Sequence, residues 1–141
     1  MIFYSKTIRS QRKALAPGND KGGAIVVRRG DVFLAKIEKG VGSEQHGNRP
    51  VVVIQNNIGN IHSPTTIVAM ITSKPKNRLP THVSLNGNSI GLTNESIVIL
   101  EQIQTLDKTR FIKQIGHLDD TTMKKIDQAA AHSIGLETGK E

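Results

Sequence analysis

Short runs of apolar and β-branched residues recur along the chain from residue 30 onwards, separated by polar stretches that contain glycine, proline or asparagine. Their length and composition predict strands, at 30–38 (GDVFLAKIE), 49–56 (RPVVVIQN), 65–72 (TTIVAMIT), 81–85 (THVSL), 95–100 (ESIVIL) and 111–118 (FIKQIGHL). Strands at regular spacing with turns between them indicate a small sandwich or an open barrel. The segment 51–54 is apolar at consecutive positions, which indicates that both faces of this strand are covered.

The periodicity changes towards the C-terminus. Apolar residues now recur at spacings of three and four, which predicts an amphipathic helix, at Met123, Ile126, Ala130 and Ile134. Asp119 or Asp120 is suited to cap its N-terminus, and Gly135 to end it. His132 is expected on the surface of this helix.

The net charge of +7 is concentrated at the N-terminus. Residues 1–30 contain seven basic side chains and one acidic side chain, whereas the remaining 111 residues carry 12 basic and 11 acidic ones. The body is therefore nearly neutral, and overall basicity is a weak argument for a nucleic-acid partner. We assign residues 1–24 to a basic, flexible arm that ends in a Pro- and Gly-containing joint, and residues 25–141 to one globular domain.

Several chemistries have no counterpart in the sequence. The chain lacks cysteine, which rules out disulfides, thiolate metal sites and a cysteine nucleophile. The five histidines show no metal-binding spacing, and neither a phosphate-binding Walker loop nor a Gly-x-Ser-x-Gly elbow occurs. No apolar run approaches the ~18 residues that a membrane span needs. We therefore expect no metal, no cofactor and no membrane association, and a cytoplasmic location.

Six motifs, taken in order, resemble the MazF/PemK family of mRNA interferases: RRGDVF, VGSEQHGNRPVVVIQN, SPTTIVAMITS, LPTHV, ILEQIQTLDK and IGHLDDTTMKKID. The resemblance extends from about Ile25 to Leu136 and is greatest to the Gram-positive branch of the family. It implies a mainly β fold, a small SH3-like open barrel of the CcdB/MazF kind with a C-terminal α-helix.

The resemblance also implies an activity. The family cleaves single-stranded RNA without a metal, because the 2′-hydroxyl attacks the adjacent phosphate and leaves a 2′,3′-cyclic phosphate and a 5′-hydroxyl. Its catalytic arginine matches Arg49 and its catalytic threonine matches Thr72. A guanidinium suits the charge that develops on the phosphate, but it stays protonated and is a poor general base. The identity of the base therefore stays open, with His46 and Glu44 as candidates.

Substrate contacts are implied in three segments and are carried over residue by residue, to Gly42, Ser43, Glu44, Gln45, Leu79, Pro80, Thr81 and Gln102. Lys74, Lys76 and Arg78 also form a local basic cluster that suits an RNA backbone. The expected partners are single-stranded RNA, a second copy of the chain in a homodimer, and a cognate MazE-like antitoxin. A UACAU-like pentamer is the first guess for the cleavage sequence. The alternative is a CcdB-like toxin that binds a protein target such as gyrase and cleaves nothing.

Overall fold

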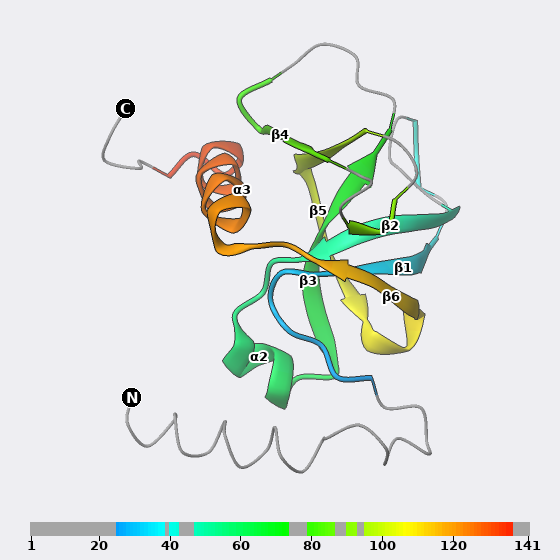
Figure 1. Ribbon diagram of the computed structural model, residues 1–141. Helices are drawn as coiled ribbons and strands as arrows, with labels where there is room; N and C mark the ends of the chain where they lie inside the picture. Colours follow the sequence, from blue (N-terminus) through cyan, green and yellow to red (C-terminus); the bar gives the residue numbers. More distant parts are fainter. Residues whose placement is uncertain are drawn as a thin grey trace.

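The computed structural model of the protein describes residues 25–38, 40–42, 47–73, 79–86, 90–92 and 95–136. Its strands are β1 (Asp31–Ile37), β2 (Gly47–Val53), β3 (Thr65–Thr72), β4 (His82–Leu85), β5 (Ser96–Asp107) and β6 (Phe111–His117). They form one six-stranded sheet in the order β4-β5-β3-β2-β1-β6, in which every neighbouring pair is antiparallel (Figure 1). The helices are α2 (Asn57–His62), the 3₁₀ turn η2 (Lys108–Arg110) and α3 (Asp120–Ser133).

All six predicted strands are present, but β5 is longer than its apolar run. It continues through the polar segment 101–107, where its residues pair with β3 from Ala69↔Ile103 to Thr65↔Asp107. A register shift between Ala69 and Met70 lets β5 bend at this point. The segment lacks a strand-like apolar pattern because much of it faces solvent, so only its pairing with β3 defines it as strand.

The short helix α2 was not predicted either. Six residues are too few for a helical periodicity to show. The Asn56 side chain caps it by accepting a hydrogen bond from the backbone N–H of Gly59 at 2.8 Å. Asn60, which is buried, is held by Gln55 and by a 2.6 Å hydrogen bond from the Thr66 hydroxyl. Side-chain amides, rather than apolar burial, therefore define this element.

Both faces of the sheet are covered, as the apolar run 51–54 predicts. Alternate strand residues point to opposite faces and form two separate cores. The first core contains Phe33 and Phe111, whose rings stack with centroids 4.4 Å apart. The second core lies between the sheet and α3, and its helical members are Met123, Ile126 and Ala129.

Helix α3 agrees with its prediction at both ends. The Asp119 side chain accepts a hydrogen bond from the Thr122 N–H at 2.8 Å, and Gly135 has the positive φ of 78° that commonly ends a helix. His132 is exposed, as expected. The prediction that Ile134 belongs to the apolar face of the helix was wrong, because this residue is 66% exposed. The helix ends at Ser133, so the helical periodicity no longer applies to the next residue.

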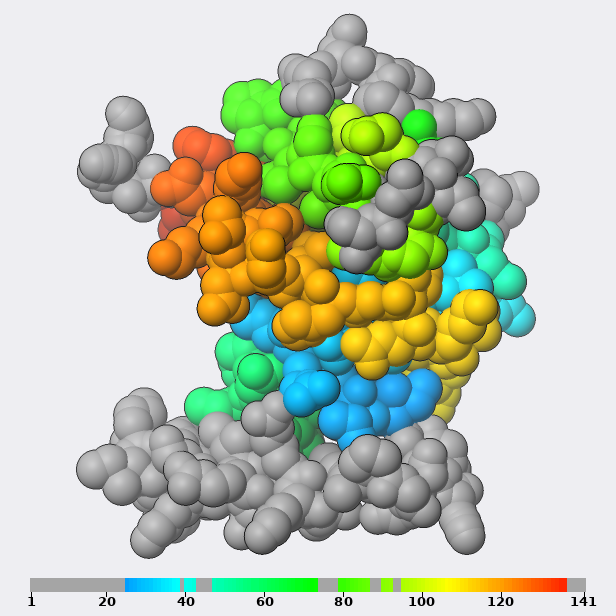
Figure 2. Space-filling view, in the orientation of Figure 1, coloured from blue at the N-terminus to red at the C-terminus, as the bar shows by residue number. Residues whose placement is uncertain are grey.

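A short segment, residues 90–92, connects the two edges of the sheet. It lies between β4 and β5 in the sequence, yet it packs against β6 at the other end of the strand order. A Cβ atom on Gly91 would lie 2.8 Å from the Ile115 carbonyl oxygen, and one on Gly116 would lie 2.7 Å from the Ile90 carbonyl oxygen. Both positions therefore require glycine. In Figure 2, β6 crosses the molecule between green residues on one side and the blue first residues of the domain on the other.

The contact between residues 90–92 and β6 curls the sheet towards an open barrel, and a mainly β fold with a C-terminal helix is confirmed. The predicted arm, residues 1–24, lies outside the described residues. Among the helices that the structure describes, none is long and apolar enough to cross a membrane.

Candidate active site

The structure brings Arg49 and Thr72 into one pocket of about 170 Å³. The pairing of β2 with β3 explains this, because Val51 lies opposite Met70 and Val53 opposite Val68. Continuing the same register towards the start of β2 places Arg49 opposite Thr72. Two residues that are 23 positions apart in the chain thus meet at the ends of adjacent strands.

The pocket combines one cation with several hydroxyl groups. Its wall is formed by seven described residues: Arg49, Pro50, Ile71, Thr72, Ser73, Leu92 and Ser96. Thr72 is only 9% exposed and Arg49 is partly buried, so the rigid sheet holds both. A guanidinium together with hydroxyl donors suits a phosphate group.

Five residues of this pocket were not predicted: Pro50, Ile71, Ser73, Leu92 and Ser96. Ser96 is 5% exposed at the start of β5, next to Ile97, which pairs with Thr72. Leu92 belongs to the segment that packs against β6, so the closure of the sheet also forms one wall of the pocket. Pro50, Ile71 and Ser73 are sequence neighbours of Arg49 and Thr72. Nothing in the local sequence marks Leu92 or Ser96, because only the fold brings these two to Arg49.

A second cluster holds the turn at residues 79–82. The Thr81 hydroxyl donates to Glu101 Oε1 at 2.6 Å, and His82 Nε2 lies 3.0 Å from Glu101 Oε2. The other ring nitrogen of His82, Nδ1, accepts the Leu79 N–H at 3.2 Å, so the hydrogen of this imidazole resides on Nε2. The Leu79 side chain remains 48% exposed beside Pro80, which is also exposed.

The expected contact residues Leu79, Pro80, Thr81 and Gln102 therefore gather at β4 and β5, since Gln102 follows Glu101 directly in β5. None of them is among the described residues that line the Arg49 pocket. Glu101 and His82 were not predicted, although they anchor this turn. The only signal in the sequence was that Glu101 directly precedes Gln102, a predicted contact residue. The hydrogen bonds of Glu101 to Thr81 and His82 reveal that it anchors the turn.

Four expected contact residues, Ser43, Glu44, Gln45 and Lys74, lie outside the described residues, as do His46, Lys76 and Arg78. Gly42 is described, is exposed and has a φ of 61°. In sequence, 43–46 leads into β2 shortly before Arg49, and 74–78 follows Ser73. In the part of the chain that the structure covers, no three His, Asp or Glu side chains gather as metal ligands would.

Comparison with known proteins defines the class first. Residues 28–134 match the family described as "PemK-like, MazF-like toxin of type II toxin-antitoxin system". This match covers most of the chain, which therefore belongs to that family of toxins. The family predicted from the motifs is confirmed.

Individual relatives make the assignment more specific. The chain is 50% identical to Endoribonuclease EndoA of Bacillus subtilis over 113 residues, which are 79% of this chain and 97% of the relative. It is 47% identical to Endoribonuclease MazF of Staphylococcus saprophyticus over 114 residues, 80% and 95% of the two chains. The predicted class, a toxin endoribonuclease of the MazF/EndoA type with Gram-positive relatives, is thus confirmed.

The fold agrees with a solved relative. A mycobacterial endoribonuclease, whose structure is that of a complex with its cognate antitoxin, superposes with a TM-score of 0.64 at 28% identity. The superposition covers 79% of this chain and 97% of the solved one.

The anchored turn generates a prediction. Burial raises the pKa of Glu101, but the hydrogen bonds from Thr81 and His82 outweigh burial, and the pKa falls below its ordinary value of 4.5. Since the folded state holds the depressed pKa, Glu101 contributes stability above pH 4.5 and loses it as the pH falls through the lowered pKa. Thr81→Val removes one donor and should raise the pKa of Glu101, which NMR titration of its carboxylate can follow.

Thr105→Val is a suitable control, because Thr105 is an exposed threonine further along the same strand. It should leave the Glu101 titration unchanged. An unchanged titration in Thr81→Val as well would contradict the anchoring role.

Proposed function

We propose that this toxin cleaves single-stranded mRNA at a short specific sequence, by a metal-independent transesterification in which Arg49 and Thr72 are the catalytic residues. The observation that carries this proposal is the meeting of both side chains in one pocket at the ends of β2 and β3. The endoribonuclease relatives support the same substrate class.

In the proposed reaction the 2′-oxygen attacks the adjacent phosphorus while the bond from phosphorus to the 5′-oxygen breaks. The products are a 2′,3′-cyclic phosphate and a 5′-hydroxyl, so the 2′-proton leaves to a base and the 5′-oxygen gains a proton. Arg49 donates to the non-bridging oxygens, where negative charge grows, and the Thr72 hydroxyl adds a further donor. The base is not assigned, because its candidates Glu44 and His46 lie outside the described residues.

Recognition of the RNA sequence belongs to the surrounding segments in this proposal. Residues 42–45, Lys74, the turn 79–81 and Gln102 read unstacked bases or follow the backbone. Single-stranded RNA is usually read in this way, by contacts to base edges that a duplex would hide. The rigid anchoring of residues 79–82 by Glu101 supports such a role for the turn, since a fixed turn discriminates better than a mobile one.

The non-catalytic CcdB-like alternative is not favoured, because the two curated relatives are named endoribonucleases. An enzyme that acts on mRNA works where mRNA is translated, so we place it in the cytoplasm.

The first test removes the proposed catalytic groups. Arg49→Ala should lower the single-turnover cleavage rate by a factor of about 10²–10³, because loss of a donor to a developing oxyanion costs ~3–4 kcal/mol. Thr72→Ala should lower it by less. The measurement uses a long RNA with end mapping in excess EDTA, with thermal melting to show that each variant is folded.

Arg110→Ala is a matched control, because this arginine pairs with Glu38 at 2.5 Å and does not line the pocket. It should cleave as the wild type does. Wild-type rates in both Arg49→Ala and Thr72→Ala would show that the catalytic assignment is wrong, and intact RNA with the wild-type protein would refute the nuclease activity itself.

The second test concerns assembly. We propose a homodimer with two-fold symmetry, in which RNA lies along the shared groove. Exposed apolar side chains supply surface for such an interface, at Val41, Leu79, Ile112, Ile134 and Leu136. Light scattering at micromolar concentration should give twice the chain mass, and a monomer would contradict the proposal.

The third test concerns the antitoxin. We propose an acidic, partly disordered antitoxin segment that folds onto the RNA-binding surface. Support comes from the solved relative that was crystallised with its cognate antitoxin. The antitoxin should inhibit cleavage competitively and should cross-link to residues 42–46 and 74–78. Cross-links confined to other segments would exclude direct competition with RNA.

A further inference from the structure

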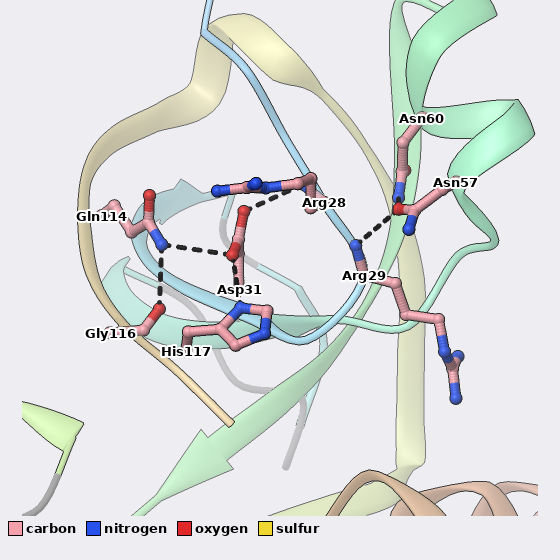
Figure 3. A network of polar contacts seen from close by, with 8 residues as sticks. All are labelled: Arg28, Arg29, Asp31, Asn57, Asn60, Gln114, Gly116 and His117. Carbon is pink, nitrogen blue, oxygen red and sulfur yellow. Dashed lines mark hydrogen bonds and ion pairs between the residues drawn. The ribbon is translucent and has the colours of Figure 1, made fainter. Parts of the chain in front are cut away.

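A second polar cleft lies at the other end of β1 from the Arg49 pocket. Its volume is about 450 Å³, and the described residues that line it are Arg28, Arg29, Asp31, Asn57, Gln114 and His117 (Figure 3). In the register of β1 with β2, Arg49 lies opposite Ala35. Asp31 is four residues earlier in the same strand, about 13 Å away along its axis.

The cleft is organised by a buried carboxylate. Asp31 is 1% exposed and accepts three hydrogen bonds, from the Arg28 backbone N–H at 2.9 Å, from Gln114 Nε2 at 3.1 Å and from His117 Nδ1 at 2.7 Å. These bonds join the start of β1 to the end of β6. Because the carboxylate is buried and already holds three donors, it offers little negative charge to a ligand in the cleft.

The remaining groups of the cleft are mainly donors. The Arg28 side chain is exposed and extends over the Asp31 carboxylate towards Gln114 (Figure 3). His117 is bound to Asp31 through Nδ1, and its second ring nitrogen lies on the far side of the ring (Figure 3). His117 Nδ1 donates to the Asp31 carboxylate, and Nε2 is the ring nitrogen that remains for a ligand.

The two neighbouring side chains, Asn57 and Arg29, already have hydrogen-bond partners. Asn57 accepts from the Arg29 N–H at 2.8 Å and from Asn60 Nδ2 at 3.1 Å, in both cases through Oδ1, so its own donor group points elsewhere. The Arg29 guanidinium turns away from Asp31 and binds Asp127 of α3 and the Ile54 carbonyl oxygen. Arg28 and His117 are thus the groups that a ligand would meet.

We infer that the cleft at Arg28, Asn57 and His117 is a second phosphate-binding site, which holds a phosphodiester of the RNA strand outside the cleaved sequence. This inference rests on the proposed ribonuclease function. An anion fits because donors line the cleft and its one described carboxylate is occupied. The level of Asp31 lies about 13 Å from that of Arg49 along β1, and the cleft shares no described lining residue with the Arg49 pocket.

The test compares two RNAs that share the mapped cleavage sequence. One has a single flanking nucleotide on each side, and the other has about ten on each side. A 2′-deoxynucleotide at the cleavage position prevents attack, so binding to the unmodified protein can be measured across a range of salt concentrations. Arg28→Ala should weaken binding of the long RNA roughly tenfold at low salt and reduce the slope of log K against log salt by about 0.7. Binding of the short RNA should not change.

Two controls isolate the contact. Lys125→Ala removes an exposed cation from α3, about 200° around the helix from Asp127, and should leave both RNAs unaffected. Arg28→Lys should restore most of the salt slope. His117→Ala should also weaken the long RNA selectively, provided that its melting curve shows a folded protein.

Three outcomes would overturn the inference. Arg28→Ala and Lys125→Ala could bind the long RNA with equal affinity, or Arg28→Ala could lose the same affinity for both RNAs. In the third, Arg28→Ala loses affinity only for an acidic antitoxin peptide. The proposed function is tested separately by the wild type. If the wild type cleaves its RNA while Arg28→Ala keeps the full salt slope, the phosphate-binding role of the cleft is refuted and the proposed ribonuclease function is retained. If the wild type neither binds nor cleaves RNA, the ribonuclease function fails as well.

Discussion

The pairing of β2 with β3 is the constraint on which the candidate site depends. The pairing aligns Val51 with Met70, and beyond this pair the two strands lead to Arg49 and Thr72, which line one pocket. A slip of one residue would turn every side chain of β2 to the other face of the sheet. Because β2 is buried on both faces from Val51 to Val53, such a slip would bury no additional apolar surface and would break two packed cores. The geometry of the candidate site thus follows from the packing that stabilises the sheet.

Closure of the sheet supplies the rest of the pocket. Gly91 and Gly116 let residues 90–92 approach β6 backbone to backbone, and Leu92 then forms a wall of the pocket. The long strand β5 serves both halves of the sheet, since it pairs with β4 at one end and with β3 along most of its length. Its Glu101 holds the turn at 79–82, so one strand supports the pocket at Ser96 and the turn at Thr81.

The ends of β1 carry different chemistry for a physical reason. Near Ala35 the strand lies beside Arg49 and is covered by the first core. At Asp31 the strand begins, and a buried carboxylate there requires donors, which the Arg28 backbone, Gln114 and His117 supply. The same bonds that satisfy Asp31 orient His117. A structural requirement and a potential binding surface therefore share one set of residues.

The sequence by itself determined the six strands, the helix α3 with its Asp119 cap and Gly135 end, and the pairing of an arginine with a threonine as catalytic candidates. Alternation, helical spacing and ordered motifs are local signals, and they survive in the chain without knowledge of its neighbours. Tertiary structure decided the strand character of 101–107, the helix at 57–62, and the roles of Ser96, Leu92, Glu101, Asp31 and His117. These residues act through partners that are distant in the chain, and only the register and closure of the sheet bring those partners into contact.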